Sequence, residues 1–460
     1  MAHETDEMTH EQAGGGPARA ARPARGEELE LVIDSLAYGG NGVARADGFV
    51  VFVSGALPGD RVRARVGKSK RGYAEAVVAE ILDPSPDRID DVCTHGGEPC
   101  PGAPWQGLAY ERQLEQKQAQ VQDSLERLGR LTGFELEPFE PAVELWRYRN
   151  KLEYSFGDAG GRLALGFHRR GRWDEVVEVD DCLLASERNN AARNEIRDWA
   201  AGLEDVPPYD RRGRTGILRN LVVREGRRTG SLHTRLVTSP GPIPSPLPVD
   251  LHTVAERPGG GTQGVTTVIG EEYLEEELSG LRLRISGEAF FQTNTEMAER
   301  LYSIAADFAG LSGSERVFDL YCGTGTIALA LAARAGEVWG LELSESAITD
   351  ARANAELNGI ANAHFLAGNA RTTIRPLVER AGKPDVVVID PPRAGLSAKI
   401  VRRVIECEAE RIVYVSCNPT TLAPNAAQLK EAGYRLRRVK PVDMFPQTPH
   451  IECVALLERA

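Results

Sequence analysis

The residue of this chain that could most readily carry out covalent chemistry is Cys417. An apolar, β-branched run from Ile412 to Val415 predicts a short buried strand, and Asn418-Pro419 after the cysteine ends it. A thiol is thus presented at a strand end. Such a cysteine can be a small hydrophobic side chain or, as a thiolate, a nucleophile. The rest of the chain must decide between these two interpretations.

A second strand end carries a carboxylate in a stiff loop. The apolar run from Asp385 to Ile389 leads into Asp390-Pro391-Pro392-Arg393. The two prolines restrict the backbone, so the Asp390 carboxylate is expected at the mouth of a crevice at the sheet edge. Asp-Pro also occurs in structural turns, but this one follows an apolar core strand, which favours a functional role.

A glycine-containing turn earlier in the chain has the pattern of a nucleotide site. A strand from Arg316 to Leu320 is followed by Tyr321-Cys322-Gly323-Thr324-Gly325, a helix from Ile327 to Ala335, and a strand from Val338 that ends at Glu342. The glycines let the backbone approach a ligand closely, and an acidic residue about 20 positions later can hold ribose hydroxyls. The turn lacks the full dinucleotide fingerprint, so we expect S-adenosylmethionine rather than NAD.

These residues need a common scaffold, and from about Phe290 strands alternate with helices. This pattern predicts an α/β domain with a parallel sheet and helices on both faces, which we place at residues 281–460. In such a sheet the strands end at one edge. Asn369, after the strand that ends at Gly368, is expected at this edge, where it could contact an adenine.

Two β-rich regions precede this domain. Residues 27–88 alternate apolar and polar side chains between turns, which predicts a small β-barrel, and residues 89–280 form a central β-rich domain. The polar residues 1–26 are expected to be a disordered tail.

Basic residues are clustered although the net charge is −12. Six lie between Arg61 and Arg71 without an acid, seven lie between Arg147 and Arg172 among six aromatic residues, and eight arginines lie between Arg211 and Arg235. These clusters favour contacts with nucleic-acid phosphates. The alternatives are a solvated hairpin face and aromatic residues that pack inside a sheet, and we expect packing for most of the aromatic residues.

Composition limits the class of protein. A chain of 460 residues is expected to form two to four domains, and it contains no apolar run of bilayer length and no secretory signal. We therefore expect a cytoplasmic monomer that does not enter a membrane. The seven cysteines are odd in number and scattered, which argues against a disulfide framework and leaves reduced thiols, a metal cluster or a nucleophile.

Five motifs, taken in order, resemble those of the RNA uracil-C5 methyltransferases. They are Phe291-Gln292-Thr293-Asn294, Asp319-Leu320-Tyr321-Cys322-Gly323-Thr324-Gly325, Asp390-Pro391-Pro392-Arg393, Ser416-Cys417-Asn418-Pro419 and His450-Ile451-Glu452. Residues 27–88 also resemble the TRAM domain, an RNA-binding barrel of the OB type, through the segments Gly39–Ala44 and Ala56–Val62.

The resemblance implies a Rossmann-like class I methyltransferase domain, a central RNA-binding domain and an OB-type barrel. It also implies formation of 5-methyluridine in RNA. Carbon 5 of uracil is a poor nucleophile, but addition of a thiolate to carbon 6 turns it into a reactive enolate carbon. Cys417 would be this thiolate, and Glu452 would be the base that removes the proton from carbon 5. The target uridine must be unpaired or flipped out of its helix.

The resemblance further assigns S-adenosylmethionine contacts, and Asp390 could also orient the uracil. The implied contacts are Gln292, Tyr321, Gly323, Gly325, Glu342, Asn369 and Asp390. We expect rRNA rather than tRNA as the substrate, because the barrel is typical of the members that act on rRNA.

The chain departs from the family pattern in two places. Members with the barrel often carry four cysteines for a [4Fe–4S] cluster; Cys93, Cys100 and Cys182 match three of them, but Ala103 replaces another. We expect the cluster to be lost, with a three-thiolate cluster as the alternative. Pro424-Asn425 stands where the family usually has Arg-Asp, which puts helix capping there in doubt.

Two other functions compete with this one. An RNA-binding or chaperone protein with a vestigial methyltransferase domain would not need both Cys417 and Glu452, and the chain has both. A DNA cytosine-C5 methyltransferase would place its nucleophile directly after a proline, whereas Ser416 precedes Cys417.

Overall fold

The computed structural model describes residues 21–95, 97–169, 171–241, 243, 252–256, 266–269 and 273–460. The chain divides into two compact units, Met1–Arg88 and Ile89–Ala460. Each helix within the described residues is too short or too polar to cross a bilayer.

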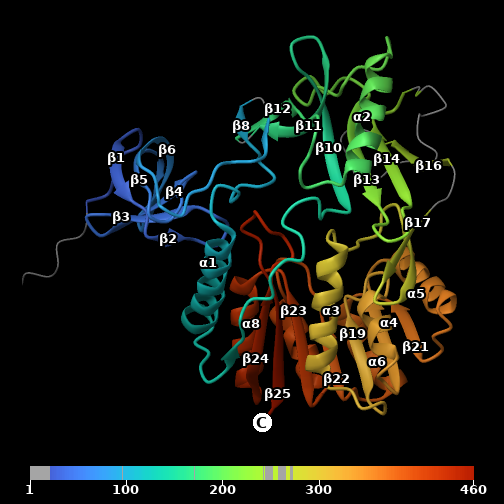
Figure 1. Ribbon diagram of the computed structural model, residues 1–460. Coiled ribbons are helices and arrows are strands. Elements are labelled where there is room, and N and C mark those ends of the chain that lie inside the picture. The colour runs from blue at the N-terminus through green and yellow to red at the C-terminus, as the bar shows by residue number, and fades with distance from the viewer. Residues whose placement is uncertain are drawn as a thin grey trace, which may run out of the picture. The chain divides into compact units, whose positions relative to one another are not determined.

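The first unit is built on a six-stranded sheet with the order β1-β5-β6-β4-β3-β2 (Figure 1). Every second residue of its β4 strand is buried, as the alternating sequence pattern predicts. The strands are β1 (Glu28–Val32), β2 (Ser35–Leu36), β3 (Gly42–Ala46), β4 (Phe49–Ser54), β5 (Arg61–Ser69) and β6 (Tyr73–Asp83).

The predicted tail is attached to this sheet over the part that the structure describes. The backbone N–H of Gly26 donates to the carbonyl of Val66 at 2.8 Å, and the Arg22 side chain donates to the side chain and carbonyl of Ser69. Residues 1–20 of the predicted tail lie outside the described residues.

The basic run along β5 faces acids that are distant in sequence. Lys68 lies 3.5 Å from Glu75 of β6, and Arg65 lies 2.7 Å from Glu28 of β1. Arg63 likewise pairs with acids on both neighbouring strands. The number of basic residues between Arg61 and Arg71 is therefore larger than the number of unpaired positive charges on this strand. Counting residues along the sequence does not include the acids on the neighbouring strands.

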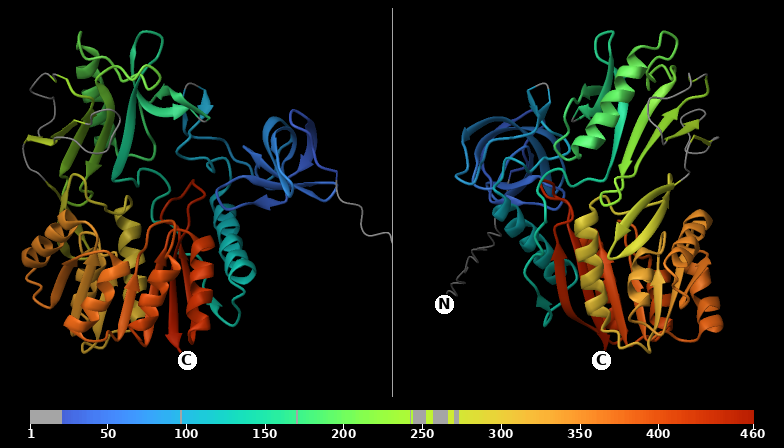
Figure 2. Two further views of the ribbon diagram at one scale, coloured as in Figure 1. Left: turned by 180° about the vertical axis from the view of Figure 1, so that it is seen from behind. Right: turned by 45° about the vertical axis from the view of Figure 1, so that its right-hand side comes forward.

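The second unit contains a seven-stranded sheet with the order β12-β11-β10-β13-β14-β15-β16, with helix α2 (Glu187–Ala201) packed on it (Figure 2). Strands β13 and β14 form an antiparallel pair in this sheet. The strands are β10 (Lys151–Asp158), β11 (Leu163–Arg169), β12 (Arg172–Glu178), β13 (Leu218–Glu225), β14 (Leu232–Thr238), β15 (His252–Glu256) and β16 (Thr266–Ile269).

The aromatic residues and arginines of this sheet behave differently from each other. Tyr148, Tyr154 and Phe156 are buried in the core, so the packing interpretation is confirmed for them, whereas Trp173 is 56% exposed. Arg170 lies outside the described residues. Several arginines form ion pairs: Arg147–Asp181, Arg169–Glu175, Arg212–Asp174, Arg227–Glu144 and Arg235–Glu288.

The second unit also contains an eight-stranded sheet with the order β21-β20-β19-β22-β23-β25-β24-β9. All neighbouring strands are parallel except β25, which is antiparallel to β23 and β24. The strands are β9 (Glu135–Leu136), β19 (Arg316–Leu320), β20 (Glu337–Glu342), β21 (Ala363–Ala367), β22 (Val386–Ile389), β23 (Arg411–Ser416), β24 (Tyr434–Val442) and β25 (Glu452–Arg459).

Helices cover both faces of this sheet, as the sequence predicts (Figures 1 and 2). They are α1 (Tyr110–Asp123), continued by the π-helical turn η1 (Ser124–Leu128), then α3 (Thr295–Ala309), α4 (Thr326–Ala332), α5 (Glu345–Leu357), α6 (Ala370–Ala381), α7 (Ala398–Glu406) and α8 (Pro419–Glu431). The strand order reverses between β19 and β22, and ligands of open α/β sheets bind outside the strand ends at such a point. A two-stranded hairpin, β17 (Tyr273–Leu278) with β18 (Leu281–Ser286), lies beside α5.

Candidate active site

The structure brings Cys417 and Glu452 to the same end of two paired strands. The antiparallel pairing of β23 with β25 matches Ser416 with Cys453. The next residues outward, Cys417 and Glu452, therefore face each other across the strand pair. Glu452 is buried with 4% exposure, and Cys417 is partly exposed. A thiol open to a ligand thus stands beside a buried carboxyl group.

Asp390 lies at the same edge of the sheet. It follows β22, whose last residue, Ile389, is paired with Leu320 of β19 and Tyr414 of β23. The backbone N–H of Asp390 also donates to the Leu320 carbonyl at 3.2 Å. Burial raises the pKa of the Asp390 carboxyl to about 7. The carboxyl group is therefore placed between the glycine turn after β19 and the cysteine after β23.

Burial first, and the charges of neighbouring groups second, raise the pKa values of this cluster. Burial, followed by the negative charge of Asp390, raises the pKa of Glu452 well above its usual range. Burial, followed by the charges of Glu452 and Asp390, raises the pKa of the Cys417 thiol to about 12. Arg393 opposes both shifts. Sequence analysis did not assign Arg393 to the site, although it ends the Asp390-Pro391-Pro392 motif.

The glycine turn is bonded to the acid that was predicted to act with it. Gly323 donates its backbone N–H to Oε2 of Glu342 at 3.3 Å, and Leu343 and Ser344 donate to Oε1 at 2.7 and 3.0 Å. Gly325 has a φ of +83°, and a Cβ there would lie 3.0 Å from the Phe365 ring. At Gly323 a Cβ would meet open space. The turn therefore leaves room for a ligand above a fixed carboxylate.

Asp319 is a buried acid that sequence analysis did not assign to the site. Its side chain is fully buried in β19, and neither carboxyl oxygen accepts a hydrogen bond of ordinary geometry within the described chain, although the backbone N–H of Ala328 lies near enough to lower its pKa slightly. Burial, followed by the charge of Asp390, raises its pKa to about 8. The sequence does contain a signal for this residue, because Asp319 is an acid inside an otherwise apolar strand. A buried acid whose hydrogen bonds are incomplete fits a site that receives a ligand with hydrogen-bond donors or positive charge.

Asn369 and Gln292 differ in burial and in their contacts. Asn369 is exposed, and its side chain caps α6 by accepting from the Arg371 N–H at 3.0 Å. Gln292 is buried, and its carbonyl accepts from the Asn150 amide at 2.9 Å. Asn294 caps α3 and donates to the Met444 carbonyl at 3.0 Å. The segment of Gln292 is thereby joined to the loop that precedes Glu452.

That loop, residues 443–451, is held by α1 and the chain before it. Lys117 and Asp443 form an ion pair at 2.6 Å, and both side chains are fully buried. Tyr110 donates to the same carboxylate at 2.9 Å. Gln113 and Gln447 exchange two hydrogen bonds at 2.7 and 3.0 Å. These contacts fix the approach of the chain to Glu452.

We expect Lys117→Met to destabilise the second unit by about 3 to 5 kcal/mol, because Asp443 would remain buried without its cation. Chemical denaturation followed by tryptophan fluorescence measures this loss. Lys399→Met, at an exposed position of α7, is the matched control and should change stability little. A loss below about 1 kcal/mol for Lys117→Met would contradict this role of the ion pair.

The helix after Cys417 is capped in spite of its departure from the family pattern. Asn418 accepts from the Thr420 N–H at 3.0 Å. Asn425 accepts from the Leu396 N–H at 2.8 Å and donates to the Leu396 carbonyl at 3.0 Å. The doubt about capping was therefore wrong, because Asn418 supplies the cap and Asn425 holds the loop after Asp390.

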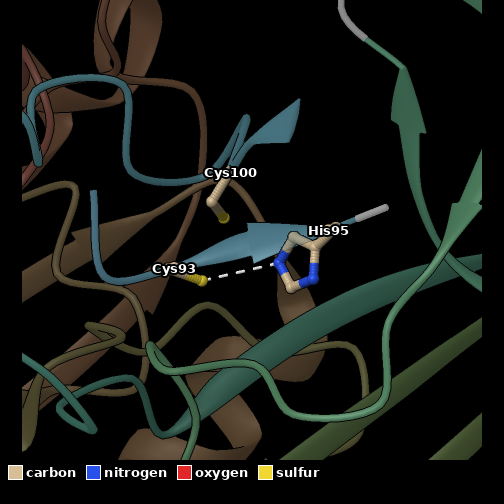
Figure 3. Close-up of side chains that lie close together, drawn as sticks. All are labelled: Cys93, His95 and Cys100. Carbon is tan, nitrogen blue, oxygen red and sulfur yellow. Dashed lines mark hydrogen bonds between the residues drawn. The ribbon is translucent and has the colours of Figure 1, made fainter. Parts of the chain in front are cut away.

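Of the three cysteines assigned to a remnant metal site, Cys93 and Cys100 come together with a histidine elsewhere in the second unit. Cys93, Cys100 and Cys182 are buried in one hydrophobic cluster that also contains Ala103. His95 joins them, with its Nε2 3.5 Å from the Cys93 sulfur (Figure 3). The position that Ala103 occupies offers a methyl group and no ligand, so these residues do not supply the four thiolates of a [4Fe–4S] cluster.

Comparison with known proteins agrees with this geometry. The model of the tRNA (uracil-5-)-methyltransferase family matches residues 260–460, and the TRAM domain model matches residues 23–79. An uncharacterized RNA methyltransferase of Halalkalibacterium halodurans is 38% identical over 449 residues, which cover 94% of this chain and 97% of that protein. One of Porphyromonas gingivalis is 39% identical over 465 residues, which cover 93% and 99%.

A solved structure extends the similarity to the whole fold. The tRNA (uracil-54, C5)-methyltransferase of Pyrococcus abyssi, in complex with S-adenosyl-L-homocysteine, has a TM-score of 0.75 and 28% sequence identity. The match covers 93% of this chain and 100% of that chain. The chain therefore belongs to the RNA uracil-C5 methyltransferase family, as an S-adenosylmethionine-dependent enzyme with an N-terminal TRAM domain.

Proposed function

We propose that this enzyme forms 5-methyluridine in RNA through a transient covalent bond between Cys417 and carbon 6 of the target uracil. The observation that carries the proposal is the placement of Cys417 opposite Glu452 at the end of β23 and β25. A nucleophile and a base must both reach one pyrimidine ring, and adjacent strand ends allow this.

Cys417 and Glu452 act at different steps of the reaction. The Cys417 thiolate adds to carbon 6, and the electron pair of the ring double bond moves toward carbon 5 and the adjoining carbonyl. Carbon 5 would then bond to the methyl group as the bond between that methyl group and the donor's sulfonium sulfur breaks, with the electron pair staying on sulfur. Glu452 accepts the proton that carbon 5 loses. The electron pair left behind restores the double bond as the thiolate departs. Once Glu452 is ionised, its raised pKa makes it a stronger base toward this proton than an ordinary carboxylate.

The methyl donor fits at the glycine turn. When bound, S-adenosylmethionine supplies an electrophilic methyl group. Glu342, fixed by three backbone N–H groups, would hold the ribose hydroxyls, and the open space above Gly323 would admit the ligand. The buried carboxyl of Asp319 would gain a partner in a donor of the ligand. Gln292, Tyr321, Asn369 and Asp390 would complete the pocket, with Asp390 nearest to the uracil.

A groove on the first unit offers a surface for the RNA backbone. It is lined by Arg22, Arg25, Lys68 and Lys70, with Phe52 and the Lys68 partner Glu75 beside them. Cations beside an aromatic ring suit single-stranded RNA, whose phosphates and bases need both kinds of contact. The TRAM domain favours rRNA as the substrate. The Pyrococcus abyssi neighbour acts on tRNA and aligns over the whole chain, so tRNA is the second candidate.

We expect methyl-labelled S-adenosylmethionine and the enzyme to produce labelled 5-methyluridine in unmodified rRNA or tRNA, detected after digestion to nucleosides. Transcripts of both kinds should be offered in parallel, and sequencing of the labelled fragment locates the uridine. Labelled product in tRNA alone would replace the rRNA assignment. No labelled 5-methyluridine in either RNA would contradict the proposed function.

We expect Arg25→Ala with Lys70→Ala to weaken RNA binding several-fold. The slope of log affinity against log salt should become shallower by about 1.4, since each phosphate contact to single-stranded RNA contributes about 0.7. Fluorescence anisotropy with a labelled transcript at several salt concentrations measures both quantities. Lys383→Ala, before β22 and remote from the strand ends, is the control. An unchanged salt slope in the double variant would show that this groove does not bind RNA.

A further inference from the structure

We propose that Cys93, His95, Cys100 and Cys182 bind a single zinc ion. The first three belong to one short segment, in which His95 lies on β7 (Thr94–His95) and Cys100 follows β8 (Glu98–Pro99). Figure 3 shows the two sulfurs and the imidazole directed into one common space. Cys182 enters the same buried cluster from the chain before α2.

The spacing of these atoms matches the ligands of one metal ion. The sulfur of Cys93, the ring nitrogen of His95 and the sulfur of Cys100 all lie within 4.8 Å of one another, and the Cys93 to His95 distance is 3.5 Å. In a tetrahedral zinc site, bond lengths of about 2.3 Å to sulfur and 2.0 Å to nitrogen place sulfur and nitrogen about 3.5 Å apart. Two sulfurs would lie about 3.8 Å apart. The three groups therefore need little movement to share an ion.

Cys182, which lies in the same buried cluster as Cys93 and Cys100, would supply the fourth ligand. The N–H of Leu183, its neighbour in the chain, donates to the Cys93 sulfur, which places this segment beside the other ligands. The Cys182 sulfur in turn receives the N–H of Leu184, and the Cys100 sulfur receives that of Gly102. Three thiolates and one imidazole are a ligand set typical of structural zinc.

The same residues do not suit a four-iron cluster. Each thiolate of such a cluster binds a different iron atom, so its sulfur ligands lie further apart than the ligands of one ion. Ala103, which stands where the family has a further cysteine, is fully buried in the same cluster and cannot replace that thiolate. His95 brings the number of ligands back to four, but around one ion.

A bound zinc ion would link the segments that carry Cys93 and Cys182 to the loop of residues 443–451, which precedes Glu452. Gln106 binds the backbone of Cys93 with two hydrogen bonds of 2.8 Å, and the adjacent Trp105 N–H donates to the Gln447 carbonyl at 3.0 Å. Gln447 belongs to the loop that leads to Glu452. A zinc ion at Cys93 would therefore stabilise the position of this loop from outside the catalytic sheet.

The test is the metal content of the full chain, purified without oxygen and without metal-chelating resin. Elemental analysis should find about one zinc per chain, and iron and acid-labile sulfide should be near zero. Cys93→Ser and His95→Asn should each lose zinc to a chelator at least about tenfold more readily than the wild type. Cys407→Ala, which removes a buried thiol at the end of α7, is the matched control and should retain its zinc.

Cobalt substitution of the wild-type chain tests the site without a variant that could fail to fold. Strong absorption from thiolate-to-cobalt charge transfer, with the intense visible bands of a tetrahedral ion, is expected. Weak bands of an octahedral ion would overturn the proposal. It would also be overturned by about four iron and four sulfide per chain, by a folded wild-type chain without zinc, or by variants that hold zinc as tightly as the wild type.

Discussion

Replacing Cys417 with alanine is expected to abolish 5-methyluridine formation, with a loss of at least about 10⁴-fold in turnover. Without the thiolate, carbon 5 of uracil cannot become nucleophilic enough to accept a methyl group. The glycine turn and Glu342 are unchanged in this variant, so S-adenosylmethionine should bind as in the wild type. Labelled-methyl transfer measures the first effect, and isothermal titration with the methyl donor measures the second.

The matched control for Cys417→Ala is Cys407→Ala, which removes a buried thiol from the far end of α7. This control should keep its activity if loss of a cysteine alone does not impair the fold. Undiminished product from Cys417→Ala would rule out the covalent route, although the family assignment would stand.

Glu452→Gln is expected to separate the two halves of the reaction. The variant keeps the Cys417 nucleophile and a side chain of nearly the same shape, but it loses the base that removes the proton from carbon 5. Turnover should fall roughly 10²- to 10⁴-fold. Cys417 should remain bonded to carbon 6 of the methylated uracil, since elimination cannot occur. A protein–RNA band that survives denaturing electrophoresis would report this adduct.

Two further variants serve as controls for the covalent adduct. It should disappear in the double variant Cys417→Ala with Glu452→Gln, because its protein atom is the Cys417 sulfur. Glu431→Gln, at an exposed position of α8, should turn over normally and accumulate no adduct. Normal turnover by Glu452→Gln would show that another group takes the proton.

The edge that carries the candidate site could be predicted from sequence because its signals are local. Apolar runs mark β19, β22 and β23, and parallel strands end at one edge, so the residues after each strand must gather there. Cys417 and Asp390 were found in this way. The antiparallel insertion of β25 was not predicted, because strand direction depends on pairing with residues distant in sequence.

Contacts between distant segments account for what the sequence did not show. In the sequence, Lys117 is indistinguishable from an ordinary polar residue of a helix. Its pairing with Asp443, 326 residues later, follows from the fold alone. The basic runs likewise gave no sign of the acids on neighbouring strands. His95 lies two residues from Cys93, but its convergence with the cysteines depends on the turn between β7 and β8.

The buried ion pair between Lys117 and Asp443 bears on how the enzyme can be divided experimentally. A fragment covering residues 260–460, the extent of the family match, would contain Cys417, Glu452 and the glycine turn. It would also leave Asp443 as an uncompensated charge and would remove β9 from the edge of β24. The groups that carry out the chemistry are thus contiguous in sequence, whereas the residues that hold them in place are not. Loss of activity in such a fragment would report a misplaced loop rather than a missing catalytic group.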